Sequence, residues 1–483
     1  MANVYERGRE VEAELRQDFW GRERELAMLR DWDGGGSRLT VLYGRRRVGK
    51  TRLVEEAVGA QRLIKVEGLE GLGKREQQAV FRQMLTQQLG YSGSLPANPD
   101  WLDLLAKLSD CLGGQPAVVL FDEFQWLACG KTELVSKLKH AWDNLFSKRN
   151  CVHLIVCGSV SSFMVKKVLK SRALYGRLDR EIQLRPLLLP EVLPHFMSKR
   201  SLREAVETFM TVGGVPEYLW KFDVSRSFRV NLENLFFTPN AYFVNEFERL
   251  FASHFGTNAH YREIVLFLGR SRWADRDAIK KACELESGGR VSQYVGNLVT
   301  AGFVEEYAPV DNPQAQRRTR FRLCDPYLDM YFRFVHPNRA EINRRTAHDV
   351  FAQYLPDRRY YPWRGLAFER FCYNHRQRIA DRLGFGAVAF HAGPWYARRG
   401  DAAFQLDLVF VRADHVMTVC EMKFQDAPVG KEVIAPAEKR RLRIANPKRM
   451  TIEQVLVTAS APTKPLQDER FFHRILQLED LFG

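Results

Sequence analysis

The fold of the first part of the chain is decided by one stretch, Leu39-Thr40-Val41-Leu42-Tyr43-Gly44-Arg45-Arg46-Arg47-Val48-Gly49-Lys50-Thr51. An apolar, β-branched run leads directly into the pattern G-x-x-x-x-G-K-T, and the residues that follow have helical character. A buried strand, a glycine-rich turn and a helix in this order form the setting in which a P-loop binds phosphate groups. The stretch therefore predicts an α/β nucleotide-binding core with a parallel sheet.

Each residue type in this stretch has a chemical reason. Gly44 and Gly49 allow backbone conformations that larger residues resist, and the N–H groups of the loop and of the new helix face phosphate oxygens. Lys50 brings a positive charge to the β- and γ-phosphates, and the hydroxyl group of Thr51 can ligate Mg²⁺. No guanine-reading N-K-x-D tetrapeptide occurs, which favours ATP over GTP. The predicted nucleotide-binding residues are Gly44, Arg45, Arg46, Arg47, Val48, Gly49, Lys50, Thr51, Arg52, Asp122, Ser159 and Arg177.

Polar residues that follow later strands supply the expected hydrolytic groups. The apolar run from Ala117 to Phe121 ends in Asp122 and Glu123, as expected of a buried parallel strand that carries ligands at its carboxyl end. We expect Asp122 to bind Mg²⁺ and Glu123 to orient and deprotonate the attacking water. Ser159 ends the next predicted strand and is a candidate sensor of the γ-phosphate. Arg177 or Arg180 is expected either to stabilise γ-phosphate charge, in cis or in trans, or to form a surface ion pair.

Composition limits the class of protein and its partners. The 483 residues suffice for two to four domains, and 45% hydrophobic with 27% charged residues is ordinary globular composition. No apolar run is long enough to span a bilayer, no signal-peptide core is present, and the eight cysteines are scattered. These features predict a cytoplasmic protein without a membrane partner. A net charge of +15 indicates a polyanionic partner, with nucleic acid as the leading class.

The middle of the chain changes to short helices. A long helical stretch is expected from Arg226 to Phe251, followed by three short helices between residues 260 and 301 and by two short strands. Three helices and a β-hairpin predict a winged helix-turn-helix. The arginines on its second strand or the approach to it, which are expected to contact phosphates, are Arg317, Arg318, Arg320 and Arg322. In the alternative, the module packs on the ATPase core as a regulatory arm.

A second group of charged residues lies near the C-terminus. The residues from Phe404 to Arg412 and from 416 to 424 form two strands joined by a three-residue loop, which places Asp407 directly opposite Glu421. Lys423 projects from the same face as Glu421. Asp407 and Glu421 can hold Mg²⁺, and Lys423 can position or deprotonate a water for attack on a phosphodiester. The alternative is an ordinary hairpin with one polar face.

Motifs along the chain resemble those of two families. Phe19 to Glu23, the P-loop, Asp122 to Trp126, Cys157 to Ser159, Tyr175 to Arg177 and Gly213 to Pro216 resemble the archaeal-type ATPase family, a STAND branch of the AAA+ superfamily. Glu369, Asp407 and Glu421-Met422-Lys423 resemble the PD-(D/E)XK nuclease-like domain. The resemblance implies ATP acting as a conformational switch, homo-oligomers on activation, and the catalytic set Glu123, Glu369, Asp407, Glu421 and Lys423.

These observations together predict an α/β chain with five segments. They are a P-loop ATPase core (1–186), a helical lid or connector (187–258), a winged helix (259–337), a linker (338–364) and a nuclease-like domain (365–483). The leading hypothesis is an ATP-dependent switch with a Mg²⁺-dependent nuclease domain that acts on DNA in preference to RNA, in defence or nucleic-acid processing. The alternatives are an ATP-driven regulator or scaffold that binds without cutting, and a chaperone-like ATPase.

Overall fold

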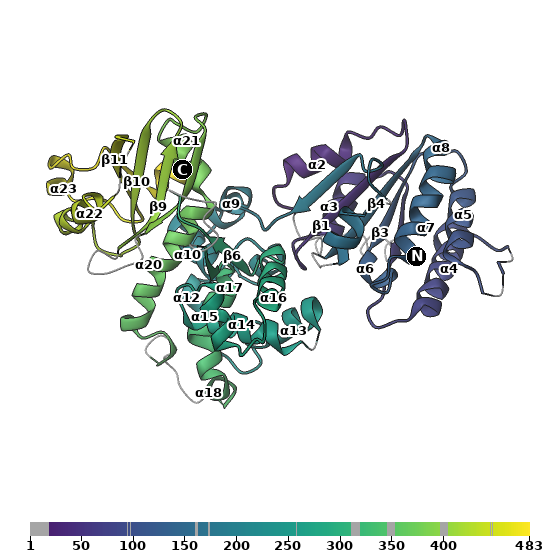
Figure 1. Cartoon of the computed structure of the whole chain (residues 1–483), viewed down its shortest axis with the longest axis horizontal. Helices are drawn as coiled ribbons and strands as arrows, with labels where there is room; N and C mark the ends of the chain where they lie inside the picture. Colours follow the sequence, from purple (N-terminus) through teal and green to yellow (C-terminus); the bar gives the residue numbers. More distant parts are fainter. Residues whose placement is uncertain are drawn as a thin grey trace, which may run out of the picture. The chain divides into compact units, whose positions relative to one another are not determined.

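The computed structural model describes residues 19–93, 95–96, 98–159, 163–171, 174–256, 258–310, 319–344, 353–396, 404–444, 446 and 448–483. Arg317 and Arg318, which were assigned to the predicted wing, lie outside the described residues. The chain divides into two compact units, Met1–Leu187 and Leu188–Gly483 (Figure 1). Among the helices of the described ranges, none combines the length and the apolar character needed to cross a membrane.

The first unit is built on a five-stranded parallel sheet with the strand order β2-β3-β4-β1-β5. The strands are β1 (Arg38–Gly44), β2 (Leu63–Glu67), β3 (Ala117–Asp122), β4 (Val152–Ser159) and β5 (Arg180–Leu184). Leu39, Val41 and Tyr43 belong to one hydrophobic core and Leu42 belongs to another, on opposite sides of β1. Because both faces are covered, the strand reads as a continuous apolar run, and the predicted parallel α/β core is confirmed.

Helices supply the two cores of this unit (Figure 1). Residues of α2 and α3 pack in the core that contains Leu42, while residues of α4, α5 and α7 pack in the larger one. The helical elements are α2 (Glu23–Arg30), α3 (Lys50–Val58), α4 (Lys74–Leu89), α5 (Trp101–Leu112), α6 (Phe124–Leu127), α7 (Glu133–Ala141), η1 (Trp142–Phe146), α8 (Ser147–Arg149) and η2 (Met164–Leu169).

The second unit opens with a helical region that has an aromatic core. The ring of Tyr218 lies 5.2 Å from that of Phe243 and 5.5 Å from that of Tyr327. The elements are α9 (Leu189–Met197), α10 (Leu202–Val212), α11 (Pro216–Leu219), α12 (Phe228–Phe236), α13 (Tyr242–Phe255), α17 (Pro326–Met330), η4 (Tyr331–Val335), η5 (His336–Asn338) and α18 (Arg339–Arg344). The single long helix expected from Arg226 to Phe251 is wrong. Pro239 and Asn240, which has φ 59°, separate α12 from α13.

Three helices and a strand pair follow α13. They are α14 (Ala259–Arg270), α15 (Arg276–Ala282), α16 (Gly288–Thr300), β6 (Val304–Tyr307) and β7 (Arg320–Leu323), and the two strands pair antiparallel. Asp275 and Ser287 cap the second and third helices by accepting hydrogen bonds from backbone N–H groups. The element order is the predicted one, and the identity of this module as a winged helix stays a prediction.

The C-terminal part contains a mixed sheet with the order β12-β11-β10-β9-β8. Strands β8 (Phe390–Tyr396), β9 (Gln405–Arg412) and β10 (Val416–Lys423) are antiparallel neighbours, and β11 (Thr451–Thr458) and β12 (Arg474–Gln477) add parallel to β10. The helices are α20 (Asp357–Asn374), α21 (Arg376–Arg382), η6 (Lys431–Val433), α22 (Ile434–Arg441), α23 (Lys464–Asp468) and α24 (Leu478–Phe482). The expected linker boundary at residues 364–365 falls inside α20.

Candidate functional site

The P-loop begins where β1 touches β5. Gly44 ends β1 and pairs with Leu184 of β5, and a Cβ atom at Gly44 would lie 2.4 Å from the Leu184 carbonyl oxygen. Gly44 is therefore required by a close approach of backbone, which differs from the conformational reason expected from the sequence. Gly49 does have that conformational reason, because its φ of 87° is unfavourable for other residues.

Lys50 is the first residue of α3 and is almost fully buried. Its Nζ donates to the Arg45 carbonyl oxygen across the loop at 3.2 Å, which folds the loop around the ammonium group. Arg22, from the predicted Phe19–Glu23 box, donates from Nη2 to the Val48 carbonyl oxygen at 3.3 Å. The box therefore supports the loop from outside by holding its backbone.

Thr51 and Asp122 meet at the carboxyl edge of the sheet. The Thr51 hydroxyl donates to Asp122 Oδ2 at 2.7 Å, and Lys65 Nζ of β2 lies 3.4 Å from the same oxygen. Burial opposes the charge of Lys65, but the Asp122 and Glu67 carboxylates outweigh it and raise the pKa of Lys65. A hydroxyl and a carboxylate in contact form a donor set that suits Mg²⁺, so these two residues fit the predicted metal role.

Glu123 stands beside this pair with an unusual backbone. Its φ of 45° places it in the left-handed region at the start of α6. Its Oε2 accepts from the Ser159 hydroxyl at 3.3 Å and from the Gln125 amide. Strand β4 lies between β1 and β3, so Ser159 at its end reaches the gap between the P-loop and the acidic residues. The arrangement orients the carboxylate that was predicted to act on water.

Arg177 is held away in an ion pair. Its Nε and Nη2 donate to Asp143 Oδ1 and Oδ2 at 2.6 and 3.0 Å, a two-point contact. Hydrogen bonds from Arg177 and Lys139 lower the pKa of Asp143 to about 2 despite a small burial effect. Arg180 pairs with Asp31. Both arginines therefore occupy the surface ion pairs that were the alternative to a γ-phosphate role, and such a role for Arg177 requires its pair with Asp143 to open.

The hairpin near the C-terminus has the predicted register. Met417 pairs with Val411 and Cys420 with Leu408. One further step along the same register places Glu421 opposite Asp407, so the three-residue loop was counted correctly. Helix α20 lies against β10 and carries Glu369, whose pKa responds to Asp407 and Glu421. The structure therefore brings together Glu369, Asp407, Glu421 and Lys423, here called the acidic cluster.

Positively charged groups engage this cluster. One nitrogen of Arg272, Nη2, donates to Asp407 Oδ1 at 2.7 Å and to Glu369 Oε2 at 3.1 Å. Lys423 Nζ lies 2.8 Å from Glu421 Oε1, and Arg440 of α22 donates to the other oxygen of Glu421. Each carboxylate of the cluster thus has a cationic neighbour from this chain.

Burial makes Glu369 the most perturbed carboxyl group of the cluster. Burial raises its pKa to about 8, the neighbouring Asp407 carboxylate acts in the same direction, and Arg272 opposes both. The carboxylates are ligands that Mg²⁺ prefers. Within the described ranges, however, no three His, Cys, Asp or Glu side chains are arranged to hold a metal ion. The cluster does not fit a metal in this arrangement because guanidinium groups engage its oxygens.

Sequence reasoning missed four residues that touch these sites: Lys65, Arg272, Gln405 and Arg440. Gln405 Nε2 donates to Asp407 Oδ1 at 2.7 Å, and its place two residues before Asp407 on one strand face was the available indication. Arg440 was noted only as part of a basic segment. Nothing in the local sequence around Lys65 or Arg272 indicates a carboxylate partner.

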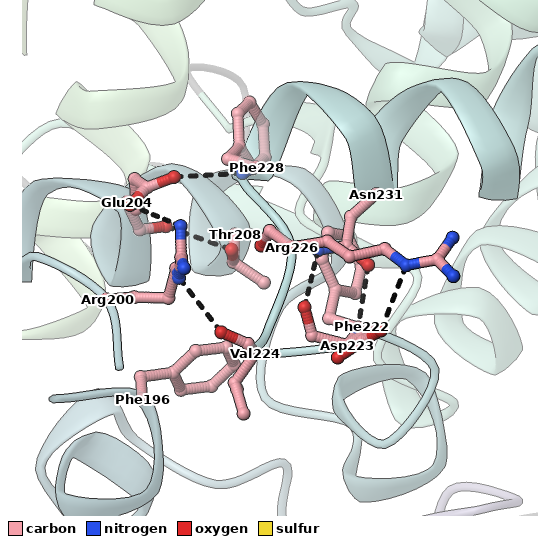
Figure 2. A pocket seen from close by; sticks show the side chains of 10 residues that line it. All are labelled: Phe196, Arg200, Glu204, Thr208, Phe222, Asp223, Val224, Arg226, Phe228 and Asn231. Carbon is pink, nitrogen blue, oxygen red and sulfur yellow. Dashed lines mark hydrogen bonds and ion pairs between the residues drawn. The ribbon is translucent and has the colours of Figure 1, made fainter. Parts of the chain in front are cut away.

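A small hollow in the helical region is already filled by its own contacts. Its volume of about 10 Å³ is close to that needed for one water molecule. Figure 2 shows Arg200 directed at the Val224 carbonyl group and Glu204 at the backbone of Phe228, with hydrogen bonds of 2.9 Å in both cases. These contacts stabilise the fold and leave no room for a larger ligand.

Comparison with family models assigns two parts of the chain. Residues 19–222 match the family described as an ATPase domain predominantly from Archaea, and residues 331–437 match a family of archaeal and bacterial proteins of unknown function. The first match contains the P-loop, Asp122, Glu123 and Ser159. The second contains Glu369 and the hairpin of the acidic cluster. The chain therefore carries an archaeal-type P-loop ATPase domain joined to a C-terminal domain whose family has no assigned activity.

Individual relatives are distant. An uncharacterised protein of Methanocaldococcus jannaschii is 26% identical over 328 residues, covering 67% of this chain and 70% of the relative. A Walker-type ATPase of Pyrococcus abyssi is 21% identical with a TM-score of 0.48, covering 66% of this chain and 97% of its own. The ORC2 protein of Aeropyrum pernix, in complexes with ADPNP and ADP, is 15% identical with a TM-score of 0.40, covering 67% and 94%.

Proposed function

We propose that this archaeal-type ATPase domain is an ATP-dependent switch that controls a nuclease-like C-terminal domain acting on DNA. The observation that carries the nuclease part is the hairpin register, which sets Asp407 opposite Glu421 with Lys423 two residues further on. Buried or half-buried strands seldom carry such residues together without a chemical role. The net charge of +15 supports a nucleic-acid partner.

The ATPase role is derived from the residues at the edge of the parallel sheet. The ammonium group of Lys50 would turn from the Arg45 carbonyl to the β- and γ-phosphates, since the two are alternative acceptors. Thr51 and Asp122 would hold Mg²⁺, which neutralises phosphate charge when it is bound. Glu123, oriented by Ser159, would accept the proton of the attacking water.

In the C-terminal domain we assign roles to the residues of the acidic cluster. Asp407 and Glu421 are the proposed ligands of a divalent cation, Glu369 shapes the charge of the site from α20, and Lys423 faces the substrate phosphate. Lys439, Arg441 and Arg443 lie near Arg440 on or directly after α22 and would follow the nucleic-acid backbone. The helices and strand pair between residues 259 and 323 would serve as a winged helix.

A second function has its own support. Arg272, Lys423 and Arg440 together balance the negative charge of the acidic cluster. A domain in this arrangement can bind nucleic acid through its basic side chains without cutting it. The chain would then be an ATP-driven regulator or scaffold, and the absence of cleavage under all conditions would favour it.

The two functions are separated by a cleavage assay with plasmid and single-stranded DNA, Mg²⁺ or Mn²⁺, with and without ATP. We expect Asp407→Asn to abolish cleavage and Asp414→Asn to retain it, because Asp414 lies in the loop of the same hairpin and pairs with Arg412. Lys50→Ala should lower ATP turnover at least about 100-fold and change cleavage, and Lys131→Ala, an exposed lysine, should do neither. Cleavage that survives Asp407→Asn would refute the nuclease assignment, while intact turnover in Lys50→Ala would refute the ATPase site.

A further inference from the structure

We propose that Arg272 is an internal plug that competes with a divalent cation for Glu369 and Asp407, so that the acidic cluster is closed until this arginine withdraws. The inference rests on the proposed function only in taking the acidic cluster to be a cation site. It adds a means of regulation, because the plug comes from the segment between α14 and α15 and not from the strands that carry the cluster.

The contacts of Arg272 are those of a competitor. A single guanidinium nitrogen donates to both carboxylates, at 2.7 Å to Asp407 and 3.1 Å to Glu369, distances typical of charge-assisted hydrogen bonds. Gln405 donates to the same oxygen of Asp407 at 2.7 Å. A metal ion bridging the two carboxylates would need those same oxygens, and it would be repelled by the guanidinium charge. Metal and plug therefore exclude each other.

The structure builds the position of the plug. Ala274 exchanges two backbone hydrogen bonds with Phe321 of β7, at 2.9 and 2.7 Å, which fixes the segment just after Arg272. Next to it, the guanidinium carbon of Arg320 lies 3.3 Å from the ring centroid of Trp273 and 3.6 Å from that of Tyr396 on β8. The Val310 N–H donates to the Pro394 carbonyl oxygen at 2.8 Å. These contacts fasten the α14–β7 module to the edge strand of the C-terminal sheet and direct Arg272 at the cluster.

The plug can also leave. The side chain of Arg272 is 47% exposed, whereas those of Glu369 and Asp407 are 22% and 20% exposed. A half-exposed guanidinium group can exchange its carboxylate partners for water at small cost. If the plug is closed nine-tenths of the time, the apparent affinity for a cation is about tenfold weaker than that of the open cluster.

The test measures binding of Mn²⁺ to the full chain by the electron paramagnetic resonance signal of unbound Mn²⁺, without nucleotide or DNA. We expect Arg272→Met, which keeps most of the side-chain volume but no charge, to bind Mn²⁺ at least about tenfold more tightly than the wild type. Arg270→Met is the matched control, because Arg270 is an exposed arginine two positions earlier. The double variant with Asp407→Asn should lose the gain. Glu421 keeps Lys423 and Arg440 in all of them, so the gain belongs to the other two carboxylates.

Unchanged Mn²⁺ affinity in a folded Arg272→Met chain, or an equal gain in Arg270→Met, would overturn the plug. If Arg272→Met fails to fold, Arg272→Gln provides the same comparison with a neutral hydrogen-bond donor. The outcome is separate from that of the nuclease proposal. Tighter binding with no cleavage in any variant would support the plug and contradict the nuclease, and cleavage by the wild type with no change of affinity would do the reverse.

Discussion

Replacing Gly44 by alanine tests the close backbone contact on which the P-loop depends. The new Cβ would lie 2.4 Å from the Leu184 carbonyl oxygen and 3.1 Å from Cγ2 of Val48. The first neighbour is backbone of β5, which is paired with β1 and cannot rotate away as a side chain can. The two strands must separate by about 1 Å to reach an ordinary contact of roughly 3.4 Å.

Overpacking of this kind costs typically about 1–3 kcal/mol, and the smaller freedom of alanine in the unfolded chain returns about 0.4–1 kcal/mol. We therefore expect Gly44→Ala to destabilise the first unit by roughly 1–2 kcal/mol. Gly114→Ala is the matched control, because no atom lies within 4 Å of its Cβ position and its φ is ordinary. It should be neutral or slightly stabilising. Gly49→Ala, with open space but φ 87°, should cost about 1–2 kcal/mol of backbone strain alone.

The assay is calorimetric unfolding of the full chain, in which the transition of the first unit is identified by its shift with added ATP. The affinity for ATP is measured on the same samples. Gly44→Ala should lower both the transition temperature and the affinity, since the loop starts at the displaced strand end. A Gly44→Ala chain as stable as Gly114→Ala, with unchanged ATP affinity, would refute the argument from close approach.

Three further predictions concern buried charges in the second unit. Asp329→Asn should destabilise the chain by about 3–5 kcal/mol in urea unfolding, because it leaves Arg370, bonded to Asp329 at 2.9 Å and nearly buried, without its anion; a loss under about 1 kcal/mol would contradict this. Because the pKa of Glu369 is raised to about 8, the folded chain holds a proton that the unfolded chain releases, so its contribution to stability falls as pH rises from about 4.5 to 8. Glu369→Gln should remove that slope, and a parallel slope in the variant would be evidence against it. Burial lowers the pKa of His375 to about 4, and its Nε2 accepts from the Leu189 N–H, so stability should fall as pH drops from 6.5 to 4 in the wild type but less in His375→Asn.

The sequence was most informative where a few neighbouring residues determine the geometry. A three-residue loop leaves one register for the hairpin, so the opposition of Asp407 and Glu421 follows from counting residues outward from the loop. The long helix expected from Arg226 failed for a local reason as well. Helical periodicity continues across Pro239 and Asn240, and the turn they impose outweighs it.

By itself, the sequence determined the P-loop, the acidic end of β3 and the hairpin of the acidic cluster, since each depends on contacts within a strand, a turn or a pair of adjacent strands. Only the tertiary structure decided which cations meet these carboxylates. Arg272 is 135 positions from Asp407, and Lys65 reaches Asp122 because β2 lies beside β3 in the sheet. Charged side chains are long and have many carboxylates within reach of a folded chain. Their partners are therefore selected by how distant elements pack, which no local pattern records.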